Sequence, residues 1–208
     1  TQRTIKTGLS LRSFAPSAVV RPLKTSLPLA IDLIMITIHS IRCARPSDLI
    51  YLPAIEREAA AQFHATPYPT MANADLASAH LDLDHDYVWV LANEQDQPIG
   101  FAIAHVLDES VHLHELDVHP HYARQGLGRR LIEAIADWAR TRGATALTLT
   151  TFRDVPWNGP YYARLGFRTL DVATLNPALQ AVRRAEESAG LPMAHRICMQ
   201  LDLSDSIR

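Results

Sequence analysis

The stretch from 111 to 152 constrains the fold more than any other part of this sequence. It opens with an alternating segment, VHLHELDV, passes through a glycine turn, QGLGR, and ends with the apolar run ATALTLTTF. Between the turn and that run, apolar residues recur at helical spacing. A strand, a turn, an amphipathic helix and a second strand in this order require a parallel strand pair joined by a right-handed crossover.

The segment that follows the glycine turn, RRLIEAIADWARTRG, predicts a helix that ends near Gly143. Its predicted buried face consists of Leu131, Ile132, Ile135, Ala136 and Ala139. Because these residues recur every three or four positions, they form one apolar stripe that can cover a sheet.

The remaining patterns predict further strands and helices around this unit. Two strands, 87–92 and 99–107, are joined by a polar turn and lead into the strand from 111, which makes an antiparallel meander. Other predicted strands are 36–44 and 193–203, and predicted helices begin near 46, 73, 159 and 175. The sequence therefore predicts an α/β domain with a mixed, mostly antiparallel sheet over residues 35–208.

The first 34 residues differ from the rest of the chain. They carry five basic residues and no acid before Asp32, and patterned sequence begins at Met35. A basic, hydroxyl-rich segment is typical of an organellar transit peptide, but no amphipathic helical face is clear. We expect an N-terminal extension outside the core and favour a cytoplasmic protein over an organellar one.

The composition excludes several classes of protein. A net charge of -2 and 48% hydrophobic residues do not suggest a nucleic-acid or membrane-surface binder. The two cysteines, Cys43 and Cys198, form no disulfide or zinc pattern, and no apolar run reaches the length of a membrane span. We expect neither a metal, a nucleic-acid partner nor a membrane partner, and a homodimer is compatible with the sequence.

The glycine turn between strand and helix suits an anion. Glycines there allow backbone N–H groups to converge at the positive end of the helix, where a phosphate or pyrophosphate binds. A dinucleotide-binding fingerprint would need a third glycine at Leu131, and a Walker loop would need Gly-Lys-Ser/Thr. Two glycines alone are also compatible with a tight turn that binds nothing.

The order LDVHPHYARQGLGRRL followed by YYARLGF resembles the GNAT superfamily of acetyl-CoA-dependent N-acetyltransferases. The resemblance implies the GNAT fold, with acetyl-CoA as co-substrate. It implies that main-chain groups of Leu116 and Val118 hold the pantetheine arm. The pyrophosphate would bind the amides of Arg124, Gln125, Gly126, Leu127, Gly128 and Arg129. One departure is Ala123, where the family has Arg or Gln.

Acetyl transfer to an amine requires a base for the ammonium proton and benefits from an acid for the thiolate. His112 and His114 are two residues apart, so a regular strand directs both to one face, and imidazoles titrate near ~6.5. Alternation places Glu115 on the opposite face as another candidate base. Non-catalytic imidazoles, or a metal site that includes His119 and His121, are the alternatives.

The segments HLHELDVH and PYYARLGF also resemble the active site of serotonin (arylalkylamine) N-acetyltransferases. That resemblance implies that His112 and His114 relay the amine proton through water and that Tyr162 protonates the thiolate. Asn158 either caps the helix from 159 or reaches the pantetheine.

Since both cysteines lie outside these motifs, direct transfer to a primary amine is favoured over an acetyl-cysteine route. The acceptor is expected to be a small molecule. A protein amine, or a module that binds coenzyme A without catalysis, are the alternatives.

Overall fold

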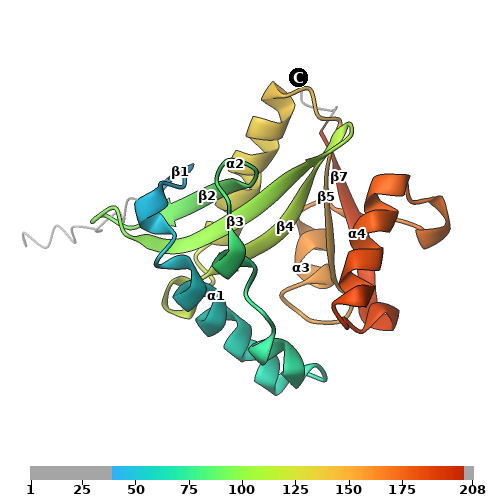
Figure 1. Ribbon diagram of the computed structural model, residues 1–208, viewed down its shortest axis with the longest axis horizontal. Helices are drawn as coiled ribbons and strands as arrows, with labels where there is room; N and C mark the ends of the chain where they lie inside the picture. The colour runs from blue at the N-terminus through green and yellow to red at the C-terminus, as the bar shows by residue number, and fades with distance from the viewer. Residues whose placement is uncertain (1–38, 204–208) are drawn as a thin grey trace, which may run out of the picture. The chain divides into compact units, whose positions relative to one another are not determined.

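The computed structural model describes residues 39–203, so the predicted extension over 1–34 lies outside the described residues. The described chain forms a seven-stranded sheet in the order β1-β2-β3-β4-β5-β7-β6, with helices on both faces (Figure 1). Within it, β4 and β5 are parallel and the other neighbouring strands are antiparallel. The predicted mixed α/β architecture and parallel crossover are confirmed.

The strands are β1 Ser40–Cys43, β2 Tyr87–Ala92, β3 Pro98–Leu107, β4 Ser110–Val118, β5 Ala146–Phe152, β6 Arg168–Thr169 and β7 Arg196–Asp202. The α-helices are α1 Leu52–Ala60, α2 Leu127–Thr141, α3 Gly159–Arg164 and α4 Pro177–Ser188. Among residues 39–203, no helix is both long and apolar enough to cross a membrane.

The first half of the chain is less helical than the sequence predicts. A 3-10 turn over Pro46–Asp48 precedes α1, and the helix predicted from 73 is only a 3-10 turn, Ala77–His80. Pro53 lies in the first turn of α1, where a missing N–H costs no hydrogen bond.

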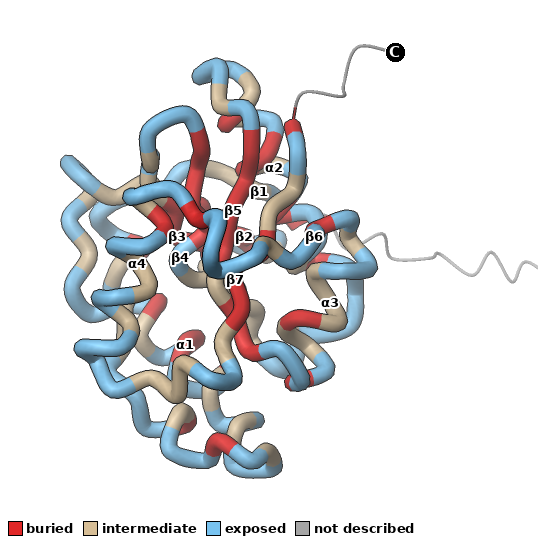
Figure 2. The backbone as a smooth tube through the Cα atoms, turned by 90° about the vertical axis from the view of Figure 1, so that its right-hand side faces the viewer, coloured by how far each residue is buried: buried red, intermediate tan, exposed pale blue. Residues whose placement is uncertain are grey.

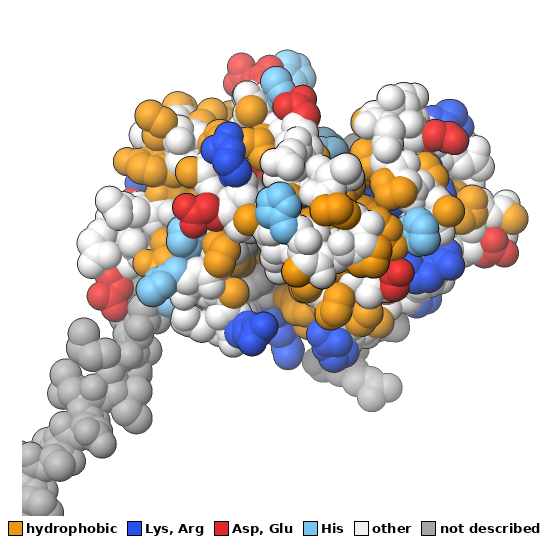
Figure 3. Space-filling model, turned by 90° about the horizontal axis from the view of Figure 1, so that it is seen from below, with side chains coloured by type: hydrophobic (Ala, Val, Ile, Leu, Met, Phe, Trp, Pro, Cys, Tyr) orange, Lys and Arg blue, Asp and Glu red, His pale blue; other side chains and the backbone are white. Residues whose placement is uncertain are grey.

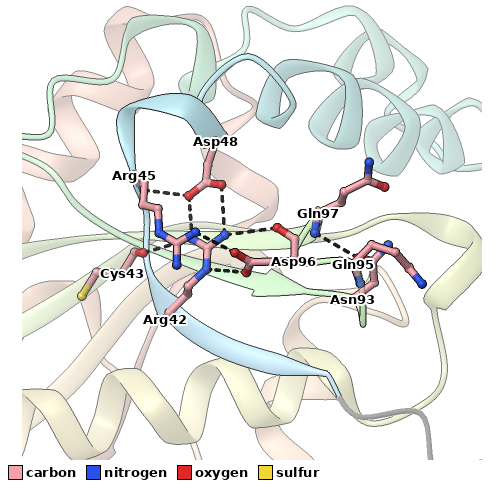
Figure 4. Close-up of polar contacts among 8 residues, drawn as sticks. All are labelled: Arg42, Cys43, Arg45, Asp48, Asn93, Gln95, Asp96 and Gln97. Atoms are coloured by element: carbon pink, nitrogen blue, oxygen red, sulfur yellow. Dashed lines mark hydrogen bonds and ion pairs between the residues drawn. The ribbon is translucent and has the colours of Figure 1, made fainter.

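An ion-pair network fixes the start of α1 against the sheet edge (Figure 4). Arg42 in β1 binds Asp48 through Nη1 at 2.6 Å and Asp96 through Nε at 2.9 Å. Arg45 reaches the other oxygen of Asp96 at 2.6 Å. Asp48 is buried, and its hydrogen bond from Arg42 lowers its pKa below the ordinary value. The network ties β1 and the turn before β3 to the segment that leads into α1.

Two apolar layers cover the sheet. On one face, α2 packs its predicted stripe against β2–β5, and all five predicted residues are buried. On the other face, α1 packs against Phe101 and Ile103 of β3, and α4 against Cys198 of β7. Figure 2 shows that burial is concentrated along the central strands. The sheet therefore forms a rigid platform between α2 on one side and α1 and α4 on the other.

The parallel pair separates halfway along its length. Pairing between β4 and β5 runs from Ser110 with Ala146 to Leu113 with Leu149. Beyond that point both strands continue, but they diverge (Figure 1). The second half of β4 consequently has β3 on one edge and no strand on the other.

A β-bulge interrupts β4 at its centre. Ile103 pairs with Glu115 and Ala104 pairs with Leu113, so His114 is an extra residue with no partner. A bulge shifts the alternation of all later side chains by one position. Glu115 and Asp117 therefore lie on the same face as Ile103 and Phe101, the face that α1 covers.

Candidate active site

The glycine turn presents a row of free backbone amides. Arg124 and Gly126 both adopt left-handed conformations, with φ of 63° and 75°, which turn the chain sharply before α2. Among the described residues, none of the amides from 124 to 129 donates a hydrogen bond to a backbone or side-chain acceptor. Converging amides at a helix N-terminus favour an anion, so this segment, 124–129, is termed the amide cradle.

The main chain of the free half of β4 points into the gap between the separated strands. The amide of His119 donates to the carbonyl of Ile99 at 2.9 Å across the β3 edge. In an antiparallel pair, residues that hydrogen-bond to the neighbouring strand alternate with residues whose N–H and C=O groups point away from that strand. Val118 and Leu116 are of the second kind. Their main-chain groups therefore face the gap, which opens toward the amide cradle, and the amide of Leu116 donates to Oε1 of Glu115 at 3.2 Å.

The far side of the gap is closed by α3. A Cβ atom at Gly128 would lie 3.1 Å from the hydroxyl of Tyr161 and 3.5 Å from Cδ2 of Leu116. A side chain at position 128 would require the Tyr161 hydroxyl to shift by a few tenths of an ångström, so glycine favours this close approach. Gly128 thus serves the contact between α2 and α3, whereas Gly126 serves the left-handed turn.

Tyr162 lies on α3 beside this gap. Its ring packs at 5.4 Å from that of Tyr161 and 5.5 Å from that of Phe167. Burial raises the pKa of Tyr162 well above its ordinary value, and the charge of Glu115 raises it further. The phenol is therefore protonated throughout the neutral range, as a proton donor must be.

His112 is enclosed by the protein. Its side chain is 2% exposed, and its Nδ1 lies 3.1 Å from the hydroxyl of Thr148. That hydroxyl donates to the carbonyl of Val111 at 3.3 Å, so it accepts from His112. Burial, and after it the nearby His114, lowers the pKa of His112 to about 3. The imidazole is neutral at pH 7.

His114, the bulge residue, has a different environment. It is exposed, and its ring packs at 5.0 Å from the ring of His105, the cross-strand partner of His112. His105 in turn lies 3.1 Å from a carboxylate oxygen of Asp86. Desolvation on the protein side of the ring, followed by His105, lowers the pKa of His114. The two histidines of the motif both flank His105, but only His114 reaches solvent.

Glu115 does not face away from His112, and that prediction is wrong because of the bulge. It meets Asp117 of the same strand and Glu56 of α1, with carboxylate oxygens of all three within 4.8 Å of one another. Burial, and then the charge of Glu56, raises the pKa of Glu115 to about 7. Burial and Glu115 together hold the pKa of Asp117 well above its ordinary value.

Sequence reasoning missed Glu56 and Asp117. Asp117 carried a usable signal, because it is two residues from Glu115 and shares its strand face. Glu56 carried none, since it lies on a helix far earlier in the chain. Its two oxygens accept the amides of Ala77 at 2.8 Å and Ser78 at 2.9 Å, which joins α1 to the following 3-10 turn.

Three other candidate residues lie apart from this cluster or behave differently from prediction. His119 pairs with Glu58 at 2.8 Å and accepts the amide of His121, so neither histidine joins His112 and His114. Asn158 stands at the start of α3, but its side chain makes no cap hydrogen bond. Of the two roles expected for Asn158, the side-chain cap is not formed, since only its carbonyl serves the helix, accepting from Tyr161 and Tyr162. The contact with the pantetheine stays a prediction.

An aromatic cluster borders the end of β5. Tyr68, from the segment TPYPTM, stacks on Phe152 at 4.5 Å and donates to Asp154 at 2.9 Å. Phe63 packs against both Phe152 and Trp157. Seen from below, the molecule exposes hydrophobic side chains among scattered basic, acidic and histidine side chains (Figure 3). The segment after α1 therefore packs on the loop that leads into α3.

Comparison with known proteins connects this geometry to a family. The sequence model of the acetyltransferase (GNAT) family matches residues 52–167, which include the bulged strand, the amide cradle and α3.

Solved structures share the same fold. The PaiA N-acetyltransferase from Thermoplasma acidophilum, in complex with coenzyme A, is 15% identical; the match covers 79% of this chain and 99% of that chain, with a TM-score of 0.61. The ribosomal-protein-S18-alanine N-acetyltransferase from Escherichia coli is 22% identical over 82% and 99%, with a TM-score of 0.53.

The N-acetylglutamate synthase from Neisseria gonorrhoeae, complexed with coenzyme A and N-acetyl-glutamate, is 20% identical. The match covers 80% of this chain and 35% of that chain, with a TM-score of 0.57. At these identities the likeness shows the fold alone.

Proposed function

Because the chain belongs to the GNAT family of acetyltransferases and is therefore an acyltransferase, we propose that it moves the acetyl group of acetyl-CoA directly to a primary amine of a small molecule. The amide cradle beside the separated strands is the observation that carries this proposal. Its unbonded N–H groups match a pyrophosphate, and the gap next to it offers main-chain partners to an extended amide chain.

In this proposal the pantetheine arm lies along Leu116 and Val118. Its amide groups extend the free edge of β4 in the manner of an added strand. The N–H of Val118 points into the gap and is suited to polarise the thioester carbonyl, where negative charge develops during attack. The acetyl carbon then lies between β4 and α3.

The transfer needs two proton movements. The neutral amine attacks the carbonyl carbon, a C–N bond forms, and the C–S bond breaks as the tetrahedral oxyanion collapses. Tyr162 donates its proton to the departing sulfur, while a base takes the proton that the amine loses. The products are an N-acetyl amine and coenzyme A.

We assign the base to Glu115 rather than to His112. A base acting near neutral pH works best with a pKa close to that pH, and that of Glu115 is raised to about 7. His112 is enclosed and its pKa of about 3 leaves it a poor proton acceptor. His114 precedes Glu115 in β4 and is exposed, so in this proposal it passes protons between that site and solvent.

The test begins with thermal unfolding of the protein with and without acetyl-CoA, because a ligand of the folded state raises Tm. Thiol release is then followed with a panel of amines, and the acetylated amine is identified by mass spectrometry. Stabilisation with amine-dependent thiol release supports the enzyme. Stabilisation without it indicates a coenzyme A-binding module, and no stabilisation by acetyl-CoA or coenzyme A overturns the proposal.

The amine panel also tests two further classes of acceptor, an arylalkylamine and a peptide amine. The likeness of the His-x-His stretch to arylalkylamine N-acetyltransferases makes 2-phenylethylamine one member of the panel. A peptide with a free N-terminal alanine tests a protein amine. Preference for that peptide over every small amine would contradict the small-molecule assignment.

A further inference from the structure

The carboxylates at the centre of the site lack a counter-charge. Among residues 39–203, none of the ion pairs involves Glu56, Glu115 or Asp117. Arg196 is near enough to lower the pKa of Glu115, but its guanidinium is already paired with Glu186. Three carboxyl groups whose oxygens lie within 4.8 Å of one another repel when they are ionised, and a bound cation would offset that repulsion.

One buried oxygen in the cluster has no hydrogen-bond partner among the described residues. Glu56 accepts two backbone amides, and Glu115 accepts the amide of Leu116 at 3.2 Å. Oδ2 of Asp117 is fully buried and has no hydrogen-bond partner among the described residues. A buried carboxylate oxygen without a donor is costly, so the cluster is complete only when a ligand supplies one.

An ammonium group suits these carboxylates better than a metal ion does. Calcium and magnesium take six or more oxygen ligands, whereas both oxygens of Glu56 are occupied by N–H donors. The free acceptors that remain belong to Glu115 and Asp117. An ammonium group carries three N–H donors and needs only a few oxygens at hydrogen-bond distance.

The chain around the three carboxylates is also acidic. From 58 to 123 the sequence contains eleven Asp and Glu residues and no Lys or Arg, and this stretch supplies β2, β3, β4 and the turns beside α1. On the other face, α2 and its turn carry Arg124, Arg129, Arg130 and Arg140. Two of these, Arg129 and Arg140, are paired with Glu133 and Asp137 of the same helix. The acidic stretch from 58 to 123 favours cationic acceptors and repels a carboxylate.

We propose that the acceptor is a small dicationic amine, a diamine or polyamine, whose second ammonium binds the free carboxylate oxygens of Asp117, beside Glu56. This inference rests on the proposed function. The reacting nitrogen must become neutral before attack and transfers its proton to Glu115, so it leaves the other two carboxylates uncompensated. A second, permanent cation compensates them, and a substrate carboxylate in the same place would add a further negative charge.

The experiment compares three primary amines of matched length with the full chain and acetyl-CoA. They are 1,4-diaminobutane, 1-aminopentane and 5-aminopentanoate, which end in an ammonium, a methyl and a carboxylate group. We expect kcat/KM for the diamine to exceed that of the monoamine by about tenfold or more, and the amino acid to be slowest. Raising the salt concentration should shrink the difference between them.

Asp117→Asn removes one charge from the cluster and keeps its shape. The expected result is a fall of the diamine-to-monoamine ratio toward one, while Tm and coenzyme A binding show that the variant is folded. Glu109→Gln, which removes the same charge from an exposed position in the β3–β4 turn, is the matched control and should leave the ratio as in the wild type.

The outcomes separate the two proposals. If no amine releases thiol, the proposed function itself fails. If 1-aminopentane, 5-aminopentanoate or 2-phenylethylamine is used as well as the diamine, or if Asp117→Asn keeps the preference, the enzyme stands and the dicationic acceptor is wrong. A rise in Tm with magnesium or calcium that Asp117→Asn abolishes would make the cluster a metal site and overturn the inference.

Discussion

The two sides of strand β4 are built from different kinds of group. The side facing α2 carries apolar residues, including Leu113, Leu116 and Val118, and presents main-chain groups toward the gap. The side facing α1 carries His112, Glu115 and Asp117, all titratable. In the proposed reaction one strand serves two substrates, with backbone geometry for the cofactor and side-chain protonation for the acceptor.

The largest effect is expected where the two sides meet, at Tyr162. Tyr162→Phe removes the proposed acid, and general acid catalysis is worth ~10²–10⁴ in rate, so kcat should fall within that range. Coenzyme A affinity, measured by calorimetry, should remain near the wild-type value. Tyr161→Phe is the matched control on the same helix. An equal loss of kcat in both variants would assign the effect to packing of α3.

Glu115→Gln should affect the α1 side alone. Without the base, kcat at neutral pH should fall by about 10²-fold and recover at high pH, where the amine arrives neutral. His112→Gln should keep most of the rate. A pH–rate profile that loses its acidic limb in His112→Gln, but keeps it in Glu115→Gln, would return the base to the histidine.

Glu115→Gln should also stabilise the protein at alkaline pH. Glu115 has an ordinary pKa of 4.5 when unfolded and about 7 when folded, so the folded state retains its proton longer. The stability that this group contributes is fully present below pH 4.5 and is lost as the pH rises toward 7. Glu115→Gln removes that loss, and the free energy of unfolding at pH 8 should rise by about 1–3 kcal/mol. Denaturant unfolding at pH 4 and pH 8 measures the difference.

Gly126→Ala should affect the cofactor side alone. Its φ of 75° is left-handed, which costs a residue with a Cβ roughly 1–2 kcal/mol, so the amide cradle should relax and coenzyme A bind about tenfold more weakly. Gly143, at the other end of α2, has the same φ and open space around it. Gly143→Ala should therefore cost similar stability and leave coenzyme A affinity unchanged.

The smallest expected effect is the loss of stability that His112 causes at acidic pH. Its folded pKa of about 3 lies below the ordinary 6.5, so the unfolded state binds the proton first and stability falls as pH drops below 6.5. Between pH 7 and pH 5 the wild type should lose about 1–2 kcal/mol that His112→Gln does not lose. Parallel pH-stability curves for the two proteins would mean that the imidazole is not enclosed.

The cofactor side of β4 could be predicted from sequence because its signal is local. The glycine turn, the stripe on α2 and the strand order all lie within a short stretch, and each is confirmed. The acceptor side could not, because Glu56 reaches it from a distant helix and a bulge at His114 reverses the alternation. Neither event leaves a periodic pattern in the sequence.

Titration of Glu115→Gln/Asp117→Asn with coenzyme A tests the central claim most directly. The double variant removes the acidic groups of one side of β4 and leaves the amide cradle and the gap untouched. We predict a Kd within about twofold of the wild-type value, in a protein whose amine-dependent thiol release has been lost. Loss of coenzyme A binding together with the turnover, or no binding by the wild type, would contradict two separate sites on one strand.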